Sequence, residues 1–167
     1  GLFDYRPGQH VVMLYTPDDV PERLYVFASI SLVDHSTRTL QLALRQGEWP
    51  PIMAYLGSGL PIGTWVQIDG GHGDMVLPTP AQINSAGLTD LVMVGLGTGF
   101  APLMCMIRQL TGKPGPRITA VYGWNIGRSP KPMFHDELAV LERSGHITLI
   151  YALTGASKLA RAHWNSN

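Results

Sequence analysis

The chain has 167 residues, a length that suits one domain or two small ones at about 150 residues per domain. Hydrophobic residues make up 45% of it and charged residues 14%, a balance that excludes an intrinsically disordered chain. The 12 basic residues offset the 12 acidic ones, so no overall field directs the protein to nucleic acid or to an anionic membrane. The single cysteine, Cys105, excludes an intrachain disulfide framework and a multi-cysteine metal site.

Membrane and secretion signals are missing from the sequence. No run approaches the roughly 20 apolar residues that a membrane helix needs. The first ten residues lack the basic region followed by an apolar core that marks a signal peptide. We therefore expect no membrane insertion and, by default, a cytoplasmic location. Because the sequence begins with Gly1 and not with Met, we expect it to be a fragment.

The first half of the sequence predicts short strands separated by turns. Its apolar and β-branched runs are bounded by Pro, Gly and Asp, as at 16–19 and 70–74. The 19 glycines and 13 prolines of the chain are typical of a turn-rich antiparallel β domain. The expected elements are strands at 10–15, 23–30, 39–45 and 65–69 and a short helix at 52–56. A small barrel or sandwich follows from this pattern.

The second half of the sequence has a different pattern of apolar residues. Apolar runs that predict fully buried strands alternate with segments that have helical spacing of apolar residues. Strand, helix, strand, helix, strand at this spacing predicts a parallel sheet. The strands are expected at 90–95, 118–123 and 147–152, and the helices at 101–110 and 134–143. Pro, Asn, Ser and Gly gather between 79 and 88, so we expect two domains, 1–84 and 85–167.

The strongest local motif is the glycine-rich turn from Gly95 to Pro102, which follows a buried strand and opens a helix. Glycines allow a sharp turn and the close approach of a ligand. The N–H groups at a helix start favour an anion, and the Thr98 hydroxyl adds a donor. Pro102 suits the first helical turn, where its missing N–H costs nothing. The alternative is a tight strand-to-helix turn that binds no ligand.

A second motif is Arg23-Leu24-Tyr25 on a predicted strand. Alternation places Arg23 and Tyr25 on one face of that strand. A guanidinium binds a pyrophosphate with two hydrogen bonds, and a tyrosine ring covers a planar heterocycle. The alternative is an exposed strand pair with a solvated arginine.

The order of these motifs along the chain resembles a known family. Seven segments carry the resemblance: 5–9, 23–29, 63–70, 73–78, 94–102, 121–125 and 134–138. In this order they are similar to the ferredoxin–NADP reductase superfamily, which includes sulfite reductase flavoprotein-like modules. The resemblance runs from Phe3 to about Thr154. It implies a Greek-key antiparallel flavin-binding barrel, followed by a partial parallel-sheet NAD(P)-binding α/β domain. It also implies a chain truncated at both ends.

The resemblance also implies roles for individual residues. By position, Arg23 matches the arginine that holds the FAD pyrophosphate, and Tyr25 matches the tyrosine that packs on the isoalloxazine ring. The other residues implied on the flavin side are Leu24, Val26, Leu42, Ala43, Leu44, Met53 and Tyr55. Those implied on the NAD(P) side are Gly97, Thr98, Gly99, Pro102, Gly123 and Asn125.

The function implied is a flavin-dependent oxidoreductase. Hydride passes from NADH or NADPH to a bound FAD, with FMN as the alternative flavin, and electrons go on to an acceptor protein, domain or small molecule. The cofactor supplies the redox chemistry, so no residue is expected to be a catalytic acid or base. The six histidines show no metal-ligand spacing, and we expect no metal site.

Two departures from the family pattern keep an alternative open. Val26 stands where the family has Ser or Thr, and Met53 stands where a pyrophosphate-binding Ser or Thr is expected. A valine side chain cannot hydrogen-bond the flavin. The alternative is a non-catalytic electron-transfer or interaction subunit, or a degenerate remnant that binds a nucleotide without turnover. A third interpretation is a plain dinucleotide-binding module with an unrelated β partner.

Overall fold

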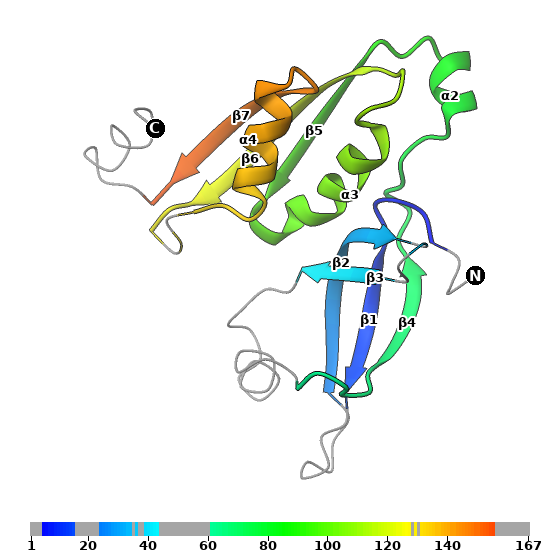
Figure 1. The fold of residues 1–167 in the computed structure, drawn as a ribbon, viewed down its shortest axis with the longest axis vertical. Helices are drawn as coiled ribbons and strands as arrows, with labels where there is room; N and C mark the ends of the chain where they lie inside the picture. The colour runs from blue at the N-terminus through cyan, green and yellow to red at the C-terminus, as the bar shows by residue number, and fades with distance from the viewer. Residues whose placement is uncertain are drawn as a thin grey trace. The chain divides into compact units, whose positions relative to one another are not determined.

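The computed structural model describes residues 5–15, 24–34, 36, 39–43, 61–127, 129 and 131–155. The chain divides into two compact units, Gly1–Leu77 and Pro78–Asn167, each built on its own sheet (Figure 1). The first sheet is antiparallel and the second is parallel. The expected order of an antiparallel module followed by a parallel α/β module is confirmed, whereas the roles assigned to domains 1–84 and 85–167 stay predictions.

The first unit contains a four-stranded sheet in the order β3-β2-β1-β4. Its strands are β1 (His10–Tyr15), β2 (Leu24–Asp34), β3 (Thr39–Ala43) and β4 (Gln67–His72). β2 is longer than expected because its apolar pattern continues to Asp34, where it still pairs with Thr39 of β3. The expected helix at 52–56 lies outside the described residues.

β4 departs from its prediction. It was expected at 65–69 with a break at 70–74, but the strand continues through Gly70 and Gly71 to His72. Gly70 has φ +136° and Gly71 has φ +42°, and the pairing with β1 changes register between His10 and Val11. Glycine adopts such angles without a Cβ penalty, so the two residues form a bulge inside the strand and do not end it.

A small apolar core lies against this sheet. Val11 of β1 and Ile30 of β2 are fully buried, and Tyr5, Leu40 and Leu42 pack against them. Burying a side chain of this size stabilises a fold by about 1.5–3 kcal/mol. The first unit thus has a small apolar core of its own.

The second unit is a three-stranded parallel sheet in the order β5-β6-β7. Its elements are α2 (Pro80–Ser85), β5 (Asp90–Leu96), the 3₁₀ turn η1 (Gly97–Phe100), α3 (Ala101–Leu110), β6 (Arg117–Asn125), α4 (His135–Arg143) and β7 (Ile147–Thr154). The predicted strands and helices are confirmed, with β5, β6 and β7 each running slightly beyond its expected end. Among the described residues, no helix has the length and apolar character needed to span a membrane.

Helix α2 was not predicted, since residues 79–88 were interpreted as a connection. Thr79 caps it: the Thr79 hydroxyl accepts from the Gln82 N–H, and the Gln82 side chain accepts from the Thr79 N–H at 2.8 Å. Pro80 occupies the first turn, where proline suits a helix. This capping box is readable from Thr79-Pro80-Ala81-Gln82, so the local signal was present but outweighed by the turn-forming residues around it.

The two faces of the parallel sheet differ. Helices α3 and α4 lie on one side of it (Figure 1), where Met93, Ala120 and Tyr122 are buried. On the other face Val92 is 63% exposed, Val94 65% and Leu96 73%. The prediction of a fully buried β5 is therefore wrong, because no element in the described part of the chain covers this second face. Parallel sheets are usually covered on both faces.

Candidate functional site

The carboxyl ends of β5, β6 and β7 share one edge of the parallel sheet. In register, Leu96 at the end of β5 pairs with Gly123 of β6, and Asn125 of β6 pairs with Thr154 of β7. In open α/β sheets, ligands bind outside this edge. The structure therefore brings the predicted nucleotide-side residues of the turn after β5 and of the end of β6 to the same edge of one unit.

The turn after β5 is open around two of its glycines. Gly97 has φ +52°, a left-handed angle that favours glycine. A Cβ added at Gly97 or at Gly99 meets no other heavy atom within 4 Å, so the space above both residues is open. The first N–H groups of a helix have no intrahelical acceptor, and here they begin beside that open space. An anion fits this arrangement of donors.

Gly95 serves packing and leaves no room for a ligand. A Cβ there lies 2.9 Å from Leu103 Cδ1 and 3.0 Å from the Phe100 Cα. The absence of that Cβ lets the start of α3 pack directly on β5. Pro102 is buried in the first turn of α3, and Cys105 is 2% exposed, as expected for a structural thiol.

An aromatic cluster lies beneath the turn, on the helix-covered face of the sheet. Tyr122 and Phe100 are both fully buried and stack with ring centroids 4.0 Å apart and 10° between planes. The Tyr122 hydroxyl donates to the Gly97 carbonyl at 3.2 Å. Trp124 meets the Tyr122 ring edge-on at 5.7 Å, and Tyr151 lies 6.1 Å from it.

Burial raises the pKa of both tyrosines in this cluster. It raises the pKa of Tyr122 well above its ordinary value; the neighbouring Tyr151 adds to the rise and the backbone of Met133 opposes it. Burial raises the pKa of Tyr151 to about 12, with the carboxylates of Glu142 and Asp136 adding to it. Both phenols therefore keep their protons at neutral pH and are available as hydrogen-bond donors.

The loop after β6 is tied to itself and to its own strand. The Asn125 side chain accepts from the Gly127 N–H at 3.0 Å, and Gly155 lies directly against it. The Trp124 indole N–H donates to the Ser129 carbonyl at 2.7 Å. At the edge of β6 that pairs with β5, the Leu96 side chain covers Gly123, so any Cβ at Gly123 would collide with it. The Asn125 side chain thus hydrogen-bonds within this loop.

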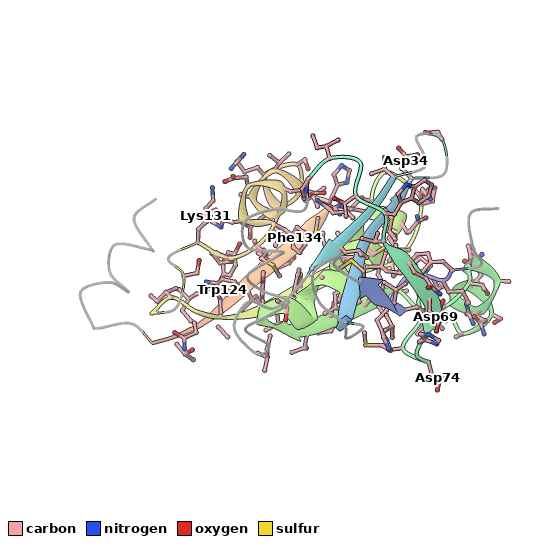
Figure 2. The ribbon with its side chains drawn as sticks, turned by 90° about the horizontal axis from the view of Figure 1, so that it is seen from below. Asp34, Asp69, Asp74, Trp124, Lys131 and Phe134 are labelled. Carbon is pink, nitrogen blue, oxygen red and sulfur yellow. The ribbon has the colours of Figure 1, made fainter. Side chains whose placement is uncertain are left out.

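The residue that precedes α4 has a strained backbone, and a side chain of α3 contacts its ring. Phe134, the N-cap, has φ 61°, a left-handed angle that is rare for an aromatic residue. The guanidinium of Arg108 lies 5.4 Å from the centre of its ring. The same guanidinium forms two hydrogen bonds with the Glu137 carboxylate. Nearby, Lys131 pairs with Asp136 at 2.6 Å (Figure 2 labels Lys131 and Phe134).

Most flavin-side predictions concern residues whose side chains the structure does not describe. Arg23, Leu44, Met53 and Tyr55 lie outside the described residues. Leu24, Tyr25 and Val26 are in β2, opposite Tyr15, Leu14 and Met13 of β1, but only their backbone is described. Leu42 and Ala43 end β3, and Leu42 packs into the core beside Val11 and Ile30. The roles of all these residues stay predictions.

Within the described residues, no group of three or more His, Cys, Asp or Glu side chains could hold a metal ion.

The sequence alone did not single out Tyr122, Phe100 or Arg108 as members of the site. The aromatic residue of Val121-Tyr122-Gly123 was a visible signal, but its contact with Gly97 spans 25 residues and depends on strand register.

Comparison with known proteins gives no match in sequence: no family model matches the chain, and no curated protein does. Solved structures do match. Ferredoxin-NADP+ reductase from Plasmodium falciparum, solved with 2'P-AMP, has a TM-score of 0.74 at 19% identity, over 94% of this chain and 62% of that one. The chain has the ferredoxin–NADP+ reductase fold.

Two other solved structures share this fold. The flavohaem-like FAD/NAD binding domain of nitric oxide dioxygenase from Vibrio cholerae has a TM-score of 0.72 at 22% identity, over 93% of this chain and 63% of that one. The cytochrome b5 reductase domain of nitrate reductase from Ulva prolifera has a TM-score of 0.66 at 16% identity, over 92% and 64%. The chain thus spans 62% to 64% of these three structures.

Proposed function

We propose that this chain is a module of a flavin-dependent oxidoreductase that takes hydride from NAD(P)H into a bound flavin and passes electrons to an acceptor. The observation that carries the proposal is the open glycine turn at the carboxyl edge of the sheet, in a chain with the ferredoxin–NADP+ reductase fold. The printed names of the similar structures add support: they are an NADP+ reductase, an FAD/NAD binding domain and a cytochrome b5 reductase domain.

The second unit supplies the nucleotide side of the proposed site. The open space above Gly97 and Gly99 fits a phosphate, and the N–H groups at the start of η1 would donate to it. Thr98 is half-buried in the same turn and adds a hydroxyl. Together these groups would bind the pyrophosphate of NAD(P)H and hold the dinucleotide at the carboxyl edge of β5 and β6.

The first unit is proposed to hold the flavin. Arg23 would bind the FAD pyrophosphate and Tyr25 would pack on the ring, as the sequence pattern implies. When bound, the flavin supplies the hydride-accepting ring and the one-electron chemistry that amino-acid side chains lack. FAD is the flavin we propose, since the V. cholerae domain is named for FAD and NAD binding.

The test is spectroscopic. The purified chain is incubated with FAD, desalted, and examined for flavin absorbance, then titrated anaerobically with NADPH and with NADH. The proposal predicts retained flavin that bleaches with one of the two nucleotides. An Arg23→Gln variant should retain less flavin, whereas an Arg6→Gln variant, altered at an exposed turn of the same unit, should retain as much as the unaltered chain. A chain that neither retains flavin nor bleaches contradicts the proposal.

A second candidate is a nucleotide-binding module without turnover. Val26 favours it, because a hydroxyl residue is expected there in a reductase with the sequence pattern described above. This candidate predicts flavin or nucleotide binding with no bleaching and no reduction of ferricyanide. The same titration therefore separates the two candidates.

A further inference from the structure

The turn Gly97–Phe100 needs an external constraint. Two of its four residues are glycines, which have more backbone freedom than any other residue. The space above Gly97 and Gly99 is open, so no neighbouring side chain restrains them from that side. A phosphate is bound tightly only when the donors are already in place, because ordering them costs conformational entropy.

One side chain from the neighbouring strand supplies that constraint. Tyr122 donates its hydroxyl to the Gly97 carbonyl at 3.2 Å and stacks on the Phe100 ring at 4.0 Å. These two contacts hold the first and the last residue of the turn. The pairing of Gly95 with Tyr122 in the β5–β6 register brings the tyrosine beneath the turn.

We propose that Tyr122 is a positioning residue for the nucleotide site, whose buried phenol holds the Gly97–Phe100 turn in the conformation that presents its N–H groups to a phosphate. The inference rests on the proposed function, because it assigns the turn to NAD(P)H. Tyr122 itself is not expected to touch the nucleotide, because it is fully buried, whereas the space at Gly97 and Gly99 is open.

The phenol is well suited to this role because it remains a donor. A tyrosine is protonated at neutral pH and burial raises its pKa further, so the hydroxyl stays able to donate to the Gly97 carbonyl, which a phenolate could not do. Phenylalanine at this position would keep the stack on Phe100 and lose the hydroxyl, with its hydrogen bond to the Gly97 carbonyl and its contact with the Met133 backbone. The substitution Tyr122→Phe therefore separates the hydroxyl from the ring stack.

Tyr151 offers a matched control. It lies in the same aromatic cluster, is half-buried and also carries a raised pKa. Its hydroxyl is 3.0 Å from Nδ1 of His135 in α4, so it meets a helix and not the turn. Tyr151→Phe removes the same hydroxyl group from the same cluster and leaves the Tyr122–Gly97 bond in place.

The first measurement is nucleotide affinity, with NADP+ and NAD+ titrated into the purified full chain by calorimetry. Losing one net hydrogen bond is expected to weaken binding about fivefold in Tyr122→Phe. Both nucleotides should be affected alike, since the turn meets the pyrophosphate they share. Tyr151→Phe should bind within about twofold of the unaltered chain. Equal affinities for all three proteins, or equal losses in both variants, overturn the proposal.

The second measurement needs no ligand. Amide hydrogen exchange of residues 97–101 is compared among the three proteins, together with their thermal midpoints. The proposal predicts exchange in this segment about fivefold faster in Tyr122→Phe and unchanged in Tyr151→Phe. Unchanged exchange in Tyr122→Phe, or faster exchange throughout the second unit with a matching loss of thermal stability, overturns the constraint.

The two measurements also separate this inference from the proposed function. If the unaltered chain binds neither NADP+ nor NAD+, the proposed function fails. In that case faster exchange confined to residues 97–101 still supports the constraint on the turn. If the unaltered chain binds a nucleotide and Tyr122→Phe binds it equally well, the proposed function stands and the role of Tyr122 fails.

Discussion

Arg108 of α3 and Glu137 of α4 form the ion pair that joins the two helices covering the parallel sheet. The Arg108 Nε lies 2.7 Å from Glu137 Oε1, and a second hydrogen bond joins Nη2 to Oε2. Arg108 is 18% exposed in its side chain and Glu137 40%, so the pair is partly withdrawn from water. The guanidinium also lies over the Phe134 ring, which links the pair to the strained start of α4.

This relationship predicts that Arg108→Lys destabilises the chain. A lysine keeps the charge but loses the paired geometry and the flat contact with Phe134. We expect a loss of about 1–2 kcal/mol in the free energy of unfolding, measured by urea denaturation. The matched control is Arg117→Lys, which alters a paired arginine whose side chain is 83% exposed beside Asp90. Its loss should be clearly smaller, because exposed ion pairs contribute little; equal losses would contradict this explanation.

The glycines around the turn should differ in their tolerance of alanine. At Gly95 a Cβ meets the Phe100 Cα at 3.0 Å and Leu103 Cδ1 at 2.9 Å, so Gly95→Ala requires the Phe100 backbone at the end of η1 and the Leu103 side chain to shift. At Gly97 the space is open but φ is +52°, which costs an alanine about 1 kcal/mol. At Gly99 neither obstacle applies. Urea unfolding should therefore rank the losses Gly95→Ala, Gly97→Ala, Gly99→Ala in decreasing order. A Gly99→Ala variant that is the least stable of the three would refute this geometry.

Truncation of two neighbouring residues of β5 should reduce stability by very different amounts. Met93 is 4% exposed beneath the helices, and Val94 is 65% exposed on the other face. Met93→Ala is expected to cost about 2–5 kcal/mol through lost burial and a cavity. Val94→Ala should cost less than about 1 kcal/mol, since it buries little surface in this chain. A comparable loss at Val94 would mean that another element covers this face in solution.

Tyr151 predicts a stability change at high pH. Its folded pKa is raised to about 12, above the ordinary value of 10.0, so the folded state favours the protonated phenol. Its contribution to stability is present in full below pH 10 and is lost as the pH rises from 10 toward 12.

Two measurements check this pH dependence. Phenolate absorbance should show one fewer late-titrating tyrosine in Tyr151→Phe than in the unaltered chain, because Tyr122 remains as a late-titrating group. Urea midpoints of the unaltered chain should fall more steeply between pH 10 and 12 than those of this variant. An unchanged number of late-titrating tyrosines in Tyr151→Phe would count against the assignment.

The elements of the second unit were largely readable from local sequence. Helix α3 was predicted with its observed bounds, 101–110, because apolar spacing, Pro102 and Gly112 are all local signals. The glycine turn was also readable, since Gly97 has the positive φ that a sharp glycine turn suggests, whereas the packing role of Gly95 was not predicted. The full extent of strand β4 was not readable from local sequence. Gly70 and Gly71 are turn signals, but pairing with β1 continues the strand through them.

By itself, the sequence determined the two-module order, most strands and helices, and the turn at the end of β5. Only the tertiary structure decided that Val92 and Val94 face outward, that Arg108 pairs with Glu137 across 29 residues, and that Tyr122 supports Gly97 across 25. The physical reason is the distance along the chain over which each signal acts. Turn chemistry and periodicity act over a few residues, whereas strand register and helix packing select partners that are distant in the chain.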